Sequence, residues 1–125
     1  PTTKTFINFE YQKDIPAKST KKRIAILGDS LTSCLQGGFE FSCWPRFLYD
    51  LIDDKEDIEV IAFYHGATTV SYKSVSPIAE DDVYKAALLS EPDIVIILLG
   101  LNDSKVGNYD KKMFKSEYKR IINDF

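Results

Sequence analysis

A serine stands directly after an apolar run near the start of the chain. Residues 24–27 read Ile-Ala-Ile-Leu, and Gly28, Asp29 and Ser30 follow at once. Glycine, aspartate and serine are ordinary turn residues, so a plain turn is one interpretation of this stretch. The other interpretation is a nucleophile, because a serine hydroxyl presented at the end of a buried strand can attack an electrophilic carbon once a base activates it.

Two further apolar runs are followed by residues that suit the second interpretation. Residues 58–64 lead to Gly66, and residues 94–99 lead to Asn102. All three runs are rich in Ile and Val without clean alternation, which is typical of strands buried on both faces of a parallel sheet. Ligand sites of such sheets lie outside the carboxyl ends of the strands. We therefore expect Ser30, Gly66 and Asn102 to converge on one crevice.

These residues together offer what a tetrahedral oxyanion needs. The backbone N–H groups of Ser30 and Gly66 and the side-chain amide of Asn102 could place three hydrogen-bond donors around one point before the reaction begins. Gly66 would also allow close approach of the backbone and an unusual dihedral angle. The predicted chemistry is attack by the Ser30 hydroxyl, with these donors holding the oxyanion.

Helical patterns separate the apolar runs and define the fold class. They span roughly residues 44–54, 80–90 and 110 onward. Strand and helix repeated three times predict an α/β fold with a parallel, doubly wound sheet and right-handed crossovers. Residues 1–22 are interpreted as an extended arm and a polar linker, and residues 23–125 as one domain. The last helical pattern carries an apolar stripe expected to pack in the core: Met113, Phe114, Tyr118, Ile121, Ile122 and Phe125.

Composition argues against several classes of protein. The 125 residues are 44% hydrophobic and 28% charged, which is typical of a soluble globular domain, and no apolar run is long enough for a membrane span. A net charge of -3, with no basic cluster interleaved with aromatics, argues against a nucleic-acid partner. There is one histidine and no metal-binding spacing, phosphate loop or dinucleotide fingerprint, so neither a metal nor another cofactor is predicted. Cytoplasmic and secreted locations both remain open.

Three short motifs resemble, in order, signature blocks of the SGNH, or GDSL, hydrolases. They are GDSLT at residues 28–32, the glycine of HGATT at Gly66, and GLND at residues 100–103. The stretch SCWPRFLYDLI at residues 42–52 is similar to the first helix of that family, so the resemblance covers roughly residues 23–103.

This resemblance implies a three-layer α/β/α, flavodoxin-like fold and serine-dependent hydrolysis of a small-molecule carboxylic ester. Ser30 would be the nucleophile, and Ser30, Gly66 and Asn102 would form the oxyanion hole. Asp29 and Asp103 would support the loops through hydrogen bonds. Acetylated sugars, lipid or aryl esters and thioesters are all compatible substrates.

The chain departs from the family pattern in one respect. The family takes its base from a late Asp-x-x-His block, and this sequence contains no such block. We therefore expect the chain to be the amino-terminal portion of a larger hydrolase whose remainder carries the aspartate and histidine. Two alternatives stay open, namely a non-catalytic esterase-like module that binds acylated or sugar ligands, and a small self-contained hydrolase that uses His65.

Several residues near the motifs have more than one interpretation. His65 is either a pocket-lining histidine or a substitute base. Phe39 and Trp44 either belong to the core or wall an acyl pocket beside the nucleophile. Cys34 and Cys43 form either a local disulfide or two free thiols, because their number and spacing favour neither.

Overall fold

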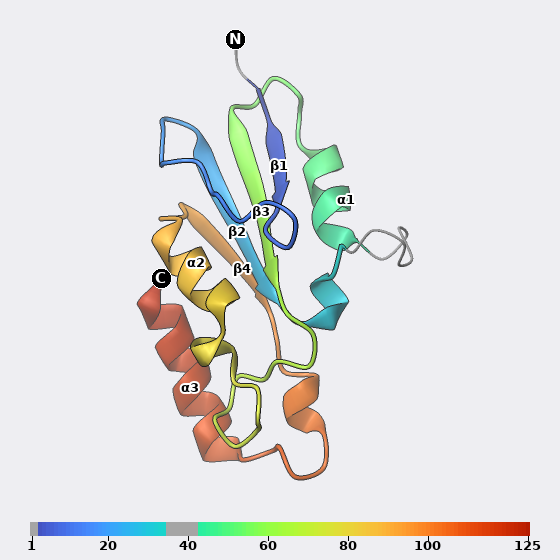
Figure 1. The fold of residues 1–125 in the computed structure, drawn as a ribbon, viewed down its shortest axis with the longest axis vertical. Coiled ribbons are helices and arrows are strands. Elements are labelled where there is room, and N and C mark those ends of the chain that lie inside the picture. The colour runs from blue at the N-terminus through green and yellow to red at the C-terminus, as the bar shows by residue number, and fades with distance from the viewer. Residues whose placement is uncertain (1–2, 35–42) are drawn as a thin grey trace.

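A parallel β-sheet forms the centre of the fold. The computed structural model describes residues 3–34 and 43–125, and within these residues four strands pair in the order β1-β3-β2-β4 (Figure 1). The predicted α/β fold with a parallel sheet is confirmed, and the three apolar runs are strands β2, β3 and β4. The strands are β1 (Thr5–Asn8), β2 (Lys22–Gly28), β3 (Ile58–Tyr64) and β4 (Ile94–Leu98).

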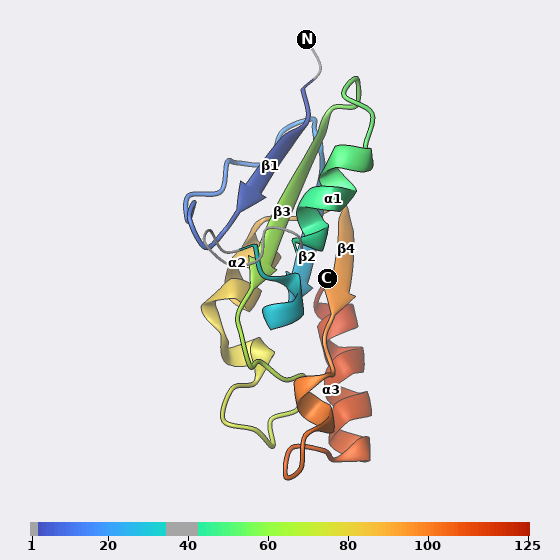
Figure 2. The ribbon, with the colours of Figure 1, turned by 90° about the vertical axis from the view of Figure 1, so that its right-hand side faces the viewer.

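Helices cover both faces of this sheet and complete three layers. Helix α1 (Trp44–Leu51) packs on one face, whereas α2 (Asp82–Leu89) and α3 (Lys111–Asp124) pack on the other (Figures 1 and 2). Each face therefore buries its own apolar cluster, which explains why the strands read as continuous apolar runs. Under α1 the buried residues are Ile24, Ile26 and Val60. Under α2 and α3 they include Ala25, Leu27, Ile61, Phe63, Ile78, Val83, Ala87 and Ile121.

The amino-terminal segment contributes a strand that the sequence did not predict. Residues 1–22 were expected to be an extended arm and a linker, but Thr5–Asn8 pairs in parallel with β3 as an edge strand. The ammonium group of Lys4 anchors this edge, because its Nζ donates to the carbonyls of Tyr49 at 3.0 Å and Ile52 at 2.8 Å. Four residues of strand-forming type do not reveal their partner, so only the structure shows the pairing.

The helices are shorter than the patterns predicted. Helix α1 ends at Leu51 because Ile52 adopts an extended backbone. Helix α2 begins at Asp82, where the Asp81 carboxylate caps the helix by accepting from the Val83 N–H at 3.0 Å. In α3 the predicted apolar stripe is too wide, since Ile122 is 56% exposed and was expected in the core.

The two cysteines form a disulfide between Cys34 and Cys43, with the Cα atoms 4.7 Å apart. The sequence left this pairing undecided. The bridge joins the segment that follows β2 to Cys43, the residue that precedes α1. It therefore ties the start of α1 to the loop after the first strand end that the motifs singled out.

Candidate active site

Ser30 lies at the carboxyl end of β2, where it begins the 3₁₀ turn Ser30–Thr32 and is exposed. The Asp29 carboxylate holds this turn by accepting from the Leu31 N–H at 2.9 Å. Strand β2 has β3 on one side and β4 on the other, so the order of the strands reverses at β2. Open parallel sheets bind ligands at such a switch point, outside the carboxyl ends of the strands. The fold thus places Ser30 where a ligand is expected.

Gly66 faces Ser30 from the end of β3. A Cβ atom built on Gly66 would lie 3.9 Å from the Cβ of Ser30, which is an ordinary contact distance. The expectation of an unusual dihedral angle at Gly66 is wrong, since the positive φ of 64° in this turn belongs to Ala67. The glycine therefore leaves space beside the serine, and the backbone conformation at this position does not require a glycine.

Asp103 joins the loop after β4 to the loop after β3. Its buried carboxylate accepts from the Val70 N–H at 3.0 Å through Oδ2 and from the Ser71 N–H at 2.9 Å through Oδ1. Two such bonds to backbone N–H groups satisfy the hydrogen-bonding capacity of this buried acid. Asp103 therefore fixes where the residues around it, including Asn102, stand relative to the β3 loop.

Asn102 links all three strand ends. Its side-chain Nδ2 donates to the Thr68 carbonyl at 3.0 Å and lies 3.4 Å from Oδ2 of Asp29. The Asp29 carboxylate is thus shared between the turn that holds Ser30 and the amide of Asn102. Both Asn102 and Asp29 are buried, so this contact lies beneath the surface that Ser30 presents.

Two hollows lie beside these residues. The one next to the serine has a volume of about 170 Å³ and is lined by Glu10, Ser30, Ser33, Tyr64, His65 and Gly66. Burial raises the pKa of the Tyr64 phenol, so this ring enters the hollow as a neutral group. The second hollow measures about 250 Å³, and Asn102 and Ala67 are among the residues that line it. The structure therefore brings Ser30 and Gly66 into one hollow and places Asn102 at the neighbouring one.

His65 is held by a partner that sequence reasoning missed. Its Nδ1 is in direct hydrogen-bond contact with Oδ2 of Asp81, while Oδ1 of the same carboxylate caps α2. The His65 side chain is 61% exposed. No hydrogen bond joins His65 to Ser30 in the structure, although both line the same hollow. Asp81 lies near the start of the predicted helical pattern at residues 80–90, a position that is typical of a helix cap and does not indicate a histidine partner.

The aromatic residues proposed for an acyl pocket have different outcomes. Phe39 lies outside the described residues. Trp44 packs against the apolar cluster beneath α1 and is not among the residues that line the hollow beside Ser30.

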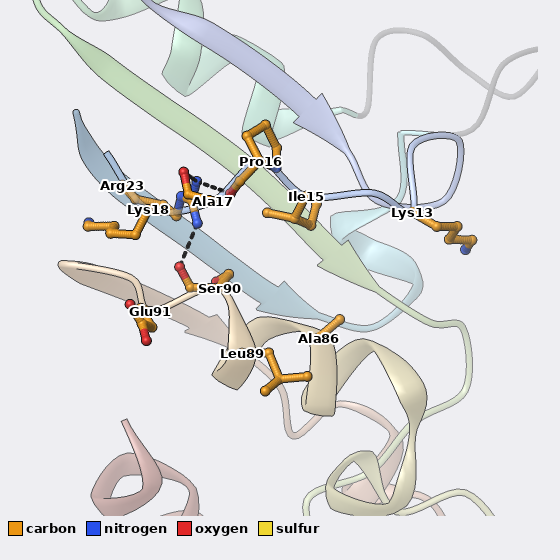
Figure 3. A pocket seen from close by; sticks show the side chains of 10 residues that line it. All are labelled: Lys13, Ile15, Pro16, Ala17, Lys18, Arg23, Ala86, Leu89, Ser90 and Glu91. Atoms are coloured by element: carbon orange, nitrogen blue, oxygen red, sulfur yellow. Dashed lines mark hydrogen bonds between the residues drawn. The ribbon is translucent and has the colours of Figure 1, made fainter. Parts of the chain in front are cut away.

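A larger hollow of about 490 Å³ lies at the opposite, amino-terminal end of β2 (Figure 3). The buried Arg23 guanidinium is fully engaged there, since it donates to the carbonyls of Ser90 and Pro16 at 2.6 Å each and pairs with Glu59 at 2.9 Å. The hydroxyl of Ser90 donates to the Ala87 carbonyl at 2.7 Å. Arg23 and Ser90 thus have structural roles in this hollow, and neither is placed as a nucleophile at the carboxyl end of a strand, as Ser30 is.

The described part of the chain has neither a metal-binding cluster nor a membrane-spanning helix. In residues 3–34 and 43–125, no three His, Cys, Asp or Glu side chains are grouped so as to hold a metal ion. Over the same ranges, no helix combines the length and the hydropathy that crossing a membrane requires.

Comparison with known proteins assigns the chain to a family. The model of the GDSL-like lipase/acylhydrolase family matches residues 24–125, and the chain therefore belongs to that family. The chain is also 32% identical over 116 residues to an acetylxylan esterase of Xylanibacter ruminicola. That match covers 88% of this chain but only 22% of the relative, so the chain spans about a fifth of the relative's length. No solved structure matches the chain. The predicted resemblance to GDSL hydrolases is confirmed.

Proposed function

We propose that this chain carries the nucleophile of a serine ester hydrolase. The observation that carries the proposal is the position of Ser30, which is exposed at the switch point of the sheet and shares a hollow with Gly66. Membership in a family of lipases and acylhydrolases supports the same reaction class. The name of the relative makes acetylated xylan the first natural substrate to try.

In the proposed reaction, the Ser30 Oγ attacks the ester carbonyl carbon while its proton passes to a general base. The tetrahedral oxyanion then collapses, the bond to the alcohol oxygen breaks, and the alcohol leaves with that proton. The acyl group remains on Ser30. A water molecule, activated by the same base, attacks this acyl-enzyme, so that the carboxylic acid is released and the serine hydroxyl is restored.

The oxyanion is proposed to accept from the N–H groups of Ser30 and Gly66 and from Nδ2 of Asn102. The first two lie at the serine hollow, and Gly66 carries no side chain to fill the space between them. Nδ2 of Asn102 has one short partner, the Thr68 carbonyl at 3.0 Å, and a longer contact of 3.4 Å with Asp29. The longer contact is the one that an oxyanion would replace. Donors fixed before the reaction stabilise developing charge without reorganisation.

The general base is proposed to lie outside these 125 residues. A serine hydroxyl is a weak nucleophile unless a base is within hydrogen-bond reach. His65 is the histidine of this sequence, and its ring contacts Asp81 and not Ser30. The proposal therefore requires a histidine, oriented by an acid, from the remainder of the whole hydrolase.

The test uses the full-length protein with a fluorophosphonate probe and with 4-nitrophenyl acetate. We expect one probe adduct, located on Ser30 by peptide mass, and loss of both labelling and hydrolysis in Ser30→Ala. Ser116→Ala, on the exposed side of α3, is the matched control and should keep both. Retained hydrolysis in Ser30→Ala would contradict the proposal. A full-length protein that binds acetylated sugars but neither labels nor hydrolyses would instead be the non-catalytic binding module.

A further inference from the structure

His65 is anchored more firmly than an exposed loop side chain requires. Its backbone N–H donates to the Gly28 carbonyl at 3.2 Å, and its carbonyl accepts from the Thr68 hydroxyl at 2.8 Å. Asp81 fixes the ring through its contact with Nδ1. The Asp81 carboxylate is itself held in place, because it also accepts from the Val83 N–H at the start of α2. Even so, the side chain remains 61% exposed at the serine hollow. The ring is thus held in place while most of it stays open to a ligand.

The contact with Asp81 decides what His65 offers to that ligand. A carboxylate accepts a hydrogen bond, so the proton of the neutral ring resides on Nδ1. The other ring nitrogen, Nε2, then carries a lone pair and accepts hydrogen bonds. A partner of this kind fixes both the tautomer and the orientation of an imidazole. Among residues 3–34 and 43–125, none makes a hydrogen bond to Nε2, which leaves this nitrogen open to a ligand.

A second acceptor lines the same hollow. Glu10 lines this hollow, and its carboxylate lies 3.7 Å from the Lys13 ammonium, a contact too long for a hydrogen bond. The residues that line the hollow with Ser30 therefore include two whose side chains carry hydrogen-bond acceptors, His65 and Glu10. A ligand that pairs with two acceptors must supply hydrogen-bond donors. In neutral esters of polyols, the free hydroxyl groups are these donors.

We propose that His65, positioned by Asp81 and assisted by Glu10, recognises free hydroxyl groups on the alcohol half of the substrate. The ligand class is the ester of a polyol or sugar that keeps hydroxyls near the ester oxygen. A substrate hydroxyl would give these acceptors a partner that a simple alkyl ester lacks, and a site built to bind a hydroxyl discriminates against ligands that lack it. This inference rests on the proposed function, because it assigns the alcohol half of the same reaction.

The experiment compares two esters with the same acyl group on the full-length protein. Glycerol monoacetate carries free hydroxyls, and propyl acetate has the same carbon skeleton without them. The readout is the ratio of kcat/KM for the first to kcat/KM for the second. We expect the ratio to be about tenfold lower in His65→Ala than in the wild type, because the variant loses one hydrogen bond to the substrate. His65→Gln, which can place an amide oxygen near the position of Nε2, should recover part of that ratio.

Asp81→Asn tests the positioning role. Asparagine caps helices as well as aspartate does, so α2 should keep its start while the carboxylate on His65 is lost. We expect the ratio to fall by about threefold, because the ring loses its fixed tautomer. Asp82→Asn is the matched control, since it removes the neighbouring, exposed carboxylate and should leave the ratio at the wild-type value.

The outcomes separate this inference from the proposed function. An active wild type whose ratio is unchanged in His65→Ala overturns the recognition role and leaves the esterase proposal in place. Equal loss of both activities in His65→Ala also overturns it, because the residue would then act in catalysis itself. A wild type that hydrolyses neither ester and is not labelled by the fluorophosphonate overturns both proposals.

Discussion

A Cβ atom on Gly28 would lie 2.0 Å from Oγ1 of Thr32 and 2.6 Å from the Thr32 Cβ. Thr32 is fully buried, and the Leu98 carbonyl oxygen would be 3.2 Å away on the adjacent strand. The chain thus turns back over the end of β2 so tightly that only a residue without a side chain fits. This contact explains why a glycine separates the apolar run from Asp29 and Ser30, and it ties the shape of the nucleophile turn to packing in the core.

Gly28→Ala should therefore destabilise the protein. Inserting a methyl group into a packed region with no room forces backbone or side-chain shifts, which cost about 1–3 kcal/mol and sometimes more. The free energy of unfolding from urea titration measures this effect. Adding Thr32→Gly to Gly28→Ala removes the two nearest atoms and should recover part of the loss. If Gly28→Ala unfolds at the wild-type urea concentration, the close packing described here is wrong.

Gly66→Ala should act on activity rather than on stability. The new methyl group would make only an ordinary contact with Ser30, and the residue lacks a positive φ, so the fold can accept it. The methyl would, however, stand in the hollow where the substrate must approach Ser30. We expect an unfolding midpoint close to wild type and a fall in kcat/KM of at least tenfold on 4-nitrophenyl acetate. A variant with full activity would mean that the substrate does not enter beside Gly66.

Asn102→Ala should lower kcat by on the order of a hundredfold or more, with a smaller change in KM, because an oxyanion donor acts in the transition state. Steady-state kinetics of the full-length protein on 4-nitrophenyl acetate separates the two constants. Ser104→Ala, two residues further along the same loop, is exposed and serves as the control. An effect confined to KM would argue that Asn102 binds the ground state and is not an oxyanion donor.

The ion pair between Lys18 and Asp93 should make stability depend on pH. The Lys18 ammonium, together with the Arg23 N–H at 2.7 Å, holds the pKa of the Asp93 carboxyl below its usual range. A carboxyl group whose pKa is lower in the folded state stabilises the fold above its unfolded pKa, about 3.9 for aspartate, and this contribution is lost as the pH falls.

Asp93→Asn tests this dependence through its melting temperature relative to wild type. We expect a difference of a few degrees at neutral pH that shrinks as the pH falls below about 4, where the unfolded chain takes up the proton before the folded state does. Glu56→Gln, an exposed site in the turn before β3, is the control and should show no such trend. A difference that is constant from pH 3 to 7 would show that Asp93 acts through its shape and not its charge.

Residue patterns predicted the central strands and the motifs at their ends because continuous apolar runs report burial on both faces, and burial on both faces implies a parallel sheet. They failed where a partner far along the chain decides the outcome. The pairing of Thr5–Asn8 with β3 is one example, and the contact between His65 and Asp81 is another. The unusual dihedral angle expected at Gly66 is absent, and the structure instead shows that the glycine leaves space beside Ser30.

The disulfide between Cys34 and Cys43 has a consequence for the covalent integrity of the chain. It closes a ring between the strand end that carries Ser30 and the start of α1. A protease that cuts once within this ring converts the chain into two polypeptides that remain one molecule until the sulfur bridge is reduced. On a gel, such a nicked protein would run as a single band without reductant and as two bands with it.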